Sequence, residues 1–107
     1  ALGYPPFARL VLVRLEGKDD ATVERTAQTL ADRLRGHARA LGIGDQAVLG
    51  PAPPPIERVR GRYRWQMLLR HPDVRGLRTL ARAARAAEAD IRARGMRLIV
   101  DVDPVSM

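Results

Sequence analysis

The residues with the clearest capacity for chemistry are four arginines that alternate along one short stretch: Arg58, Arg60, Arg62 and Arg64. A guanidinium group is planar, stays charged at neutral pH and donates hydrogen bonds in a fork that matches phosphate or carboxylate oxygens. Alternate spacing puts such side chains on one strand face or around its turn. The stretch therefore predicts an anion-binding hairpin or a charged sheet edge that blocks strand addition.

The chain from Gly61 to Pro72 alternates apolar and polar residues, which predicts a strand with two unlike faces. One face carries Tyr63, Trp65, Met67 and Leu69. The other carries Arg62, Arg64, Gln66, Leu68 and Arg70. The two aromatic rings are similar to the base-stacking platform of sheet-based RNA-binding domains. Because they share a face with Met67 and Leu69, we favour a core position for Trp65.

No catalytic constellation is evident in the sequence. Its only serine is Ser106, and Gly42 and Gly44 follow a helical pattern instead of joining a strand to a helix, so no nucleotide cradle is predicted. There is no cysteine and there are two histidines, too few for a metal site by themselves. Asp101 and Asp103 are better explained by ion pairs than by a cation site. We predict a domain that is not an enzyme and holds no metal or cofactor.

The charge is strongly basic and unevenly placed. The net charge is +7, with +1 in residues 1–50 and +6 in residues 51–107. This asymmetry favours a polyanionic or acidic partner for the second half, although an arginine- and alanine-rich composition also follows from a GC-rich genome. Five arginines fall roughly opposite the buried stripe of the second helix and indicate a solvated face, with attraction of DNA as the alternative: Arg75, Arg78, Arg82, Arg85 and Arg92.

The elements around the alternating strand are predicted in the order strand, helix, strand, strand, helix, strand. Strands are expected over residues 8–16, 47–59, 62–70 and 96–102, and the prolines between Gly50 and Ile56 make the second an interrupted edge strand. Asp19 or Asp20 and then Asp73 cap the two helices, which Gly42 and Gly95 end. We expect Arg60-Gly61 to form a hairpin turn.

This order predicts an α+β fold of the ferredoxin-like split βαβ type, a four-stranded antiparallel sheet with two helices on one face. Right-handed crossovers put the first and third strands in the centre. Residues 1–107 are predicted to form a single domain, near the commonest domain size. The chain starts at Ala1 and has no apolar run long enough for a membrane span, so we expect a soluble fragment of a longer protein.

Four motifs in order resemble the C-terminal domain of the PriA family of primosomal replication-restart helicases. They are Tyr4-Pro5-Pro6-Phe7, Leu49-Gly50-Pro51-Ala52-Pro53, Gly61-Arg62-Tyr63-Arg64-Trp65-Gln66-Met67-Leu68-Leu69 and Asp101-Val102-Asp103-Pro104. The resemblance covers essentially the whole chain. It implies a C-terminal piece of a bacterial, cytoplasmic 3′-to-5′ DNA helicase whose ATP-using and zinc-binding domains lie elsewhere, with residues 1–7 leading in from the preceding helicase lobe.

The resemblance further implies three partners: branched or single-stranded DNA, the helicase lobes of the same chain, and the acidic C-terminal tail of single-stranded DNA-binding protein. The tail-binding residues of the family fall on Arg62 and Gln66, and we assign Arg58, Arg60 and Arg64 of the hairpin to DNA.

Two alternatives to this function remain. One is a structural domain that buttresses the lobes through Tyr4 and Phe7. The other is a free-standing RNA-binding domain, which requires Tyr63 and Trp65 to lie exposed on the open sheet face.

Overall fold

The computed structural model describes residues 9–55 and 58–102, with the backbone alone for Arg58 and Val59. The Tyr4-Pro5-Pro6-Phe7 motif and Asp103 lie outside the described residues. The elements are β1 (Arg9–Gly17), α1 (Asp20–Ala40), a 3₁₀ turn (Asp45–Ala47), β2 (Val48–Ala52), β3 (Arg58–Val59), β4 (Arg62–His71), α2 (Val74–Arg85), α3 (Glu88–Ala93) and β5 (Arg97–Val102).

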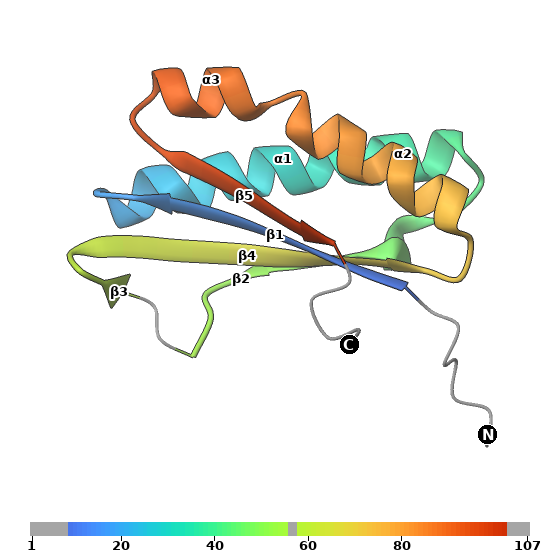
Figure 1. The fold of residues 1–107 in the computed structure, drawn as a ribbon, viewed down its shortest axis with the longest axis horizontal. Helices are drawn as coiled ribbons and strands as arrows, with labels where there is room; N and C mark the ends of the chain where they lie inside the picture. The colour runs from blue at the N-terminus through green and yellow to red at the C-terminus, as the bar shows by residue number, and fades with distance from the viewer. Residues whose placement is uncertain (1–8, 56–57, 103–107) are drawn as a thin grey trace.

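The sheet runs in the order β2-β4-β1-β5, with the short β3 paired to β4, and all pairs are antiparallel. The central strands β1 and β4 pair along their length, from Arg9 opposite His71 to Gly17 opposite Tyr63. The helices lie together on one side of the sheet (Figure 1). The ferredoxin-like α+β prediction is therefore confirmed, including its central strands and its proline-rich edge.

The core lies between the helices and one sheet face. Val11, Val13 and Leu15 of β1 and Met67 and Leu69 of β4 are all buried, because every second side chain of a strand points the same way. Facing them are buried residues of α1 and α2 at helical spacing: Val23, Ala27, Leu30, Leu34, Leu77, Leu80 and Ala84. Each large aliphatic side chain among these stabilises the fold by roughly 1.5–3 kcal/mol relative to full exposure.

Both predicted helix caps are present. The Asp19 carboxylate accepts a hydrogen bond from the backbone N–H of Thr22 at 3.0 Å, and the Asp73 carboxylate accepts one from the N–H of Arg75 at 3.0 Å. These bonds satisfy donors that have no partner within the first helical turn. The caps thus fix where α1 leaves β1 and where α2 leaves β4.

The edge strand β2 is bulged, as its prolines predict. Its register on β4 shifts between Leu49 and Ala52. On the helix side, the Arg35 guanidinium donates to the carbonyl oxygens of Val48 and Gly50, so α1 holds the irregular strand in place. Proline cannot donate to a ladder, and a bulge at an edge accommodates that loss.

The second helical region differs from the sequence expectation of one continuous helix. It divides into α2 and α3, with a turn at Ala86 and Ala87. Both residues are alanine, which favours helix, so no local signal marks the break. The turn still directs Ala87 and Ile91 into the core. No helix in the described ranges has the length and apolar character that crossing a membrane requires.

Candidate nucleic-acid and peptide interface

The sheet face turned away from the helices, called the open face below, is formed by alternate residues of β1, β4 and β5, most of them polar. Its members are Arg62, Arg64, Gln66, Leu68 and Arg70 of β4, Leu10, Leu12, Arg14 and Glu16 of β1, and Arg97, Ile99 and Asp101 of β5. Five arginines against two carboxylates make it basic. No helix of the described part covers it (Figure 1).

Gln66 lies at the centre of the open face and is held by Arg14. The two residues are cross-strand partners, and the Gln66 side-chain oxygen accepts from Nε and Nη2 of Arg14 at 3.4 and 3.2 Å. With that oxygen engaged, the Gln66 amide NH₂ has no hydrogen-bond partner among the described residues. The amide is therefore oriented as a donor toward whatever lies on this face.

Arg64 is the next residue along the same face, and it faces Glu16. Its Nε lies 3.8 Å from the Glu16 carboxylate, and both side chains are only 16% exposed. The Glu16 carboxylate thus neutralises part of the charge that Arg64 offers to a ligand. The side chain of Arg62, a half-buried residue at the start of β4, has no hydrogen bond or ion pair to another described residue.

The electrostatics of the open face act on Arg14 most strongly. Its partial burial lowers the pKa of its guanidinium, and the nearby Arg64 cation lowers the pKa further. Glu16 and Asp101 raise the same pKa and oppose these effects. Arg14 stays protonated at neutral pH. The lowered pKa therefore reflects burial first and the neighbouring Arg64 cation second.

The turn before β4 places another cation at the rim. Arg60 and Gly61 join β3 to β4 with positive φ angles of 55° and 78°, and Val59 pairs with Arg62 across the turn. Positive φ at both central residues is typical of type I′ hairpin turns, where Asn or Gly is usual in the first position. An exposed arginine there carries a backbone cost that Asn would reduce.

The structure brings together most, but not all, of the residues singled out from the sequence. Arg62, Arg64 and Gln66 share the open face, and Arg60 lies exposed at the adjacent turn. Arg58 pairs with Tyr63 in the backbone register, and its side chain lies outside the described residues. Trp65 lies on the helix side, packs against the core and donates from Nε1 to the Asp20 carboxylate at 2.8 Å.

Two arginines of this face were not found by the sequence reasoning. Arg14 and Arg97 come from β1 and β5 and stand beside Gln66 and Glu16 only because the strands pair. The available signal was the alternation of Arg14 and Glu16 with the buried Val13 and Leu15. It was obscured because Leu10 and Leu12 make both faces of the same strand apolar.

The described residues contain no cluster of three or more His, Cys, Asp or Glu side chains placed to hold a metal ion. The arrangement on the open face is instead one of donors. Guanidinium groups and one oriented amide can bind phosphate or carboxylate oxygens.

The chain is similar to one segment of several much longer proteins. A replication restart protein PriA from Haemophilus influenzae is 33% identical over 104 residues, which are 97% of this chain and 14% of that protein. A probable replication restart protein PriA from Deinococcus radiodurans is 41% identical over 106 residues, 98% of this chain and 10% of that protein. The chain thus spans about a tenth to a seventh of the length of these relatives.

A designed protein, Foldit4, shares the fold alone, with a TM-score of 0.56 at 14% identity over 89% of this chain and 94% of that one. The family model for the primosomal protein N C-terminal domain matches residues 1–105. That match takes in every strand and helix of the structure together with the Arg62–Gln66 segment, and the chain belongs to this family, the C-terminal domain of PriA.

Proposed function

We propose that this chain is a non-catalytic binding domain of a PriA-like 3′-to-5′ helicase in replication restart, acting in the bacterial cytoplasm. It contacts forked or single-stranded DNA through Arg58, Arg60 and Arg64, and it contacts the acidic C-terminal tail of single-stranded DNA-binding protein through Arg62 and Gln66. The observation that carries the proposal is the open face, where donors from β1 and β4 converge without a covering helix. ATP and zinc belong to other domains of the parent protein.

The spacing of Arg62 and Gln66 limits how a tail can bind. They are four positions apart on one strand, so their Cα atoms are about 13 Å apart. A peptide that reaches both must lie along β4 and pass Arg64. An acidic tail with a free C-terminal carboxylate would then meet the Arg62 fork at one end and the Gln66 amide at the other, with Leu68 as an apolar contact.

DNA binding is tested by titrating labelled forked DNA with the chain over a range of salt concentrations. Neutralising phosphates releases counterions, so the affinity should fall as salt rises, by about 0.7 log units per log unit of salt for each single-strand contact. Arg60→Ala with Arg64→Ala should lower the affinity and reduce that slope by about 1.4. Arg25→Ala with Arg33→Ala removes the same charge from exposed positions on α1 and serves as the control.

Equal losses of DNA affinity in both double variants would show that only the net charge of the domain matters, which would contradict the proposed surface. Absence of binding by the unaltered chain would reject a DNA role for this domain alone.

Tail binding is tested by NMR titration with an acidic peptide that ends in two aspartates and an aromatic residue. Arg62 and Gln66 signals should shift, and Gln66→Ala should weaken binding. Glu16→Gln should strengthen it by about two- to fivefold, because a carboxylate that repels the peptide is removed from beside Arg64. Unshifted Arg62 and Gln66 signals at saturating peptide would reject this site.

One alternative keeps support from a specific observation. Leu12, Leu68 and Ile99 of the open face are half-buried, and Leu49 of β2, which pairs with Leu68 next to this face, is 39% exposed. Contact with the helicase lobes would bury these apolar groups. The RNA-binding alternative required Trp65 to lie exposed on the open sheet face. Trp65 instead faces the helices, and its Nε1 donates a hydrogen bond to Asp20.

A further inference from the structure

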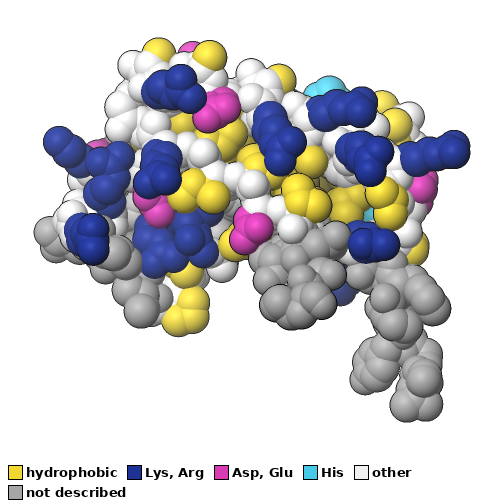
Figure 2. Space-filling model, viewed as in Figure 1, with side chains coloured by type: hydrophobic (Ala, Val, Ile, Leu, Met, Phe, Trp, Pro, Cys, Tyr) yellow, Lys and Arg dark blue, Asp and Glu magenta, His cyan; other side chains and the backbone are white. Residues whose placement is uncertain are grey.

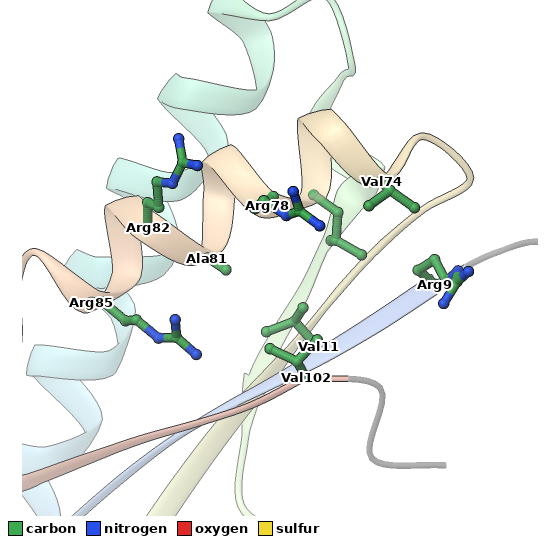
Figure 3. A pocket seen from close by; sticks show the side chains of 9 residues that line it. Arg9, Val11, Val74, Arg78, Ala81, Arg82, Arg85 and Val102 are labelled. Carbon is green, nitrogen blue, oxygen red and sulfur yellow. The ribbon is translucent and has the colours of Figure 1, made fainter. Parts of the chain in front are cut away.

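A second surface of interest is a hollow of about 430 Å³ between α2 and the ends of β1 and β5 (Figure 3). Its floor is apolar and consists of Val11, Val74, Leu77, Ala81 and Val102. Val74 is 39% exposed and Val102 is 53% exposed, although most aliphatic side chains of the described part are buried. The hollow therefore keeps aliphatic surface in contact with solvent.

The rim of this hollow is cationic. Four arginines line it, and no carboxylate does so among the described residues: Arg9, Arg78, Arg82 and Arg85. The three on α2 form no ion pair or hydrogen bond with another described side chain. Figure 3 shows the Arg85 side chain extending toward Val11 and Val102, and Figure 2 shows hydrophobic side chains edged by Lys and Arg below α2.

The hollow is separate from the open face in two respects. Its strand residues, Val11 and Val102, point to the helix side of the sheet. It also lies at the Arg9 end of β1, whereas the Arg60-Gly61 turn lies at the Gly17 end, where Gly17 pairs with Tyr63. The nine residues of β1 span about 27 Å, so one short ligand cannot occupy both places.

We propose that this hollow is a second binding site, which takes an acidic protein segment carrying an aliphatic side chain. The aliphatic group would enter the apolar floor, and neighbouring carboxylates would meet the guanidinium forks of the rim. Single-stranded nucleic acid fits less well, because no aromatic side chain lines the described hollow and bases have no ring to stack on. The inference does not depend on the roles proposed for the open face.

The first experiment compares three probes by NMR titration of the chain. They are a short peptide of aspartates with two leucines, the same peptide with serines in place of the leucines, and an oligothymidylate. The leucine peptide should shift the amide signals of Val74, Ala81 and Val102. The serine peptide should bind about tenfold more weakly, because serine buries no aliphatic surface against the apolar floor.

The second experiment uses matched variants. Arg78→Glu should weaken binding of the leucine peptide by about fivefold or more, whereas Arg75→Glu should have little effect, because Arg75 lies on the same helix but does not line the hollow. Val74→Ser should weaken binding, whereas Leu41→Ser removes an aliphatic side chain of similar exposure elsewhere and should not.

Several outcomes would overturn the proposal. One is a leucine peptide that shifts Arg62 and Gln66 instead of Val74, and another is equal losses with Arg75→Glu and Arg78→Glu. If the oligothymidylate alone shifts the hollow's signals, the site belongs to nucleic acid. Close contacts between the Phe7 ring and the Val74 methyl groups, with no effect of any probe, would assign the hollow to this chain's own N-terminal segment. None of these outcomes would reject DNA or tail binding at the open face.

Discussion

Arg60 is the residue at which backbone conformation and side-chain chemistry conflict most clearly. Its φ of 55° lies in the left-handed region, where a side chain with a Cβ is disfavoured by roughly 1–2 kcal/mol. Asn tolerates that region and is common at this turn position. Arg60 therefore carries a backbone cost at the same position where the proposed DNA contact places its exposed guanidinium.

Arg60→Asn should therefore stabilise the domain by about 0.5–1 kcal/mol while it weakens DNA binding. Thermal or urea denaturation measures the first effect, and the salt-dependent DNA titration measures the second. Gly61→Ala is the contrasting variant. It should destabilise the domain by about 1 kcal/mol, because φ is 78° there and alanine disfavours that conformation. A stability loss with Arg60→Asn would contradict the turn assigned here.

Asp19 gives a prediction on pH dependence. Hydrogen bonds from the Thr22 hydroxyl first, and from the Thr22 backbone N–H second, lower the pKa of its carboxyl group. A lowered pKa in the folded state means that the stabilisation is present above the unfolded pKa, near 3.9 for aspartate, and is lost as pH falls through the folded pKa.

Asp19→Asn keeps a capping oxygen but cannot titrate in this range. Urea denaturation between about pH 5 and pH 2 should then show a shallower loss of stability than in the unaltered chain. The same steepness in both proteins would show that the Asp19 cap contributes nothing to acid unfolding.

At the scale of the elements, α2 has an apolar side that packs against the sheet and a basic side that faces solvent. Leu80 is fully buried against the sheet, whereas Arg82 is exposed at the rim of the hollow. The apolar side docks the helix, and the basic side is available to a ligand. Substitutions on the two sides should therefore affect different measurements.

Leu80→Ala should destabilise the domain by about 2–5 kcal/mol, because it removes buried methyl groups and leaves a cavity. Arg82→Ala should change stability by less than about 0.5 kcal/mol, since the residue is exposed and has no partner in the described part. Urea denaturation of both variants measures the difference. Similar losses in the two would mean that the basic side of α2 is structural.

The elements also show how far the sequence predicts this fold and site. Alternation over residues 62–70 assigns Arg62, Arg64 and Gln66 to one face and Trp65 to the other, because the period of a strand is local information. The contact of Arg14 with Gln66 depends on strand register, which no local pattern reports. The same holds for the break at Ala86 and for the hollow, whose floor joins residues from β1, α2 and β5.

At the scale of the whole molecule, the two proposed surfaces lie on opposite faces of the sheet, and the Arg60-Gly61 turn and the hollow lie at opposite ends of β1. Residues that share no partner usually contribute additively to stability and binding. The domain could then hold one ligand along β4 and another beside α2 at the same time. Its net charge of +7 would favour acidic ligands at both places.

Combining Arg62→Ala with Arg78→Glu tests this independence. The stability changes should add within about 0.5 kcal/mol, and each substitution should weaken only the ligand of its own surface. Denaturation and the two peptide titrations provide the measurements, with both single variants as references. A larger deviation from additivity would mean that the surfaces communicate through the core.

The hydrogen bond between Trp65 and Asp20 makes the indole ring a probe of folding. It joins residues 45 positions apart, and Trp65 is the only tryptophan in the chain. Its fluorescence should therefore change when α1 docks on the central β1–β4 pair, and not when isolated helices form. The pairing of β1 with β4 joins residues that are far apart in the sequence. The fluorescence change should therefore follow the slow, topology-limited step of folding in a stopped-flow experiment.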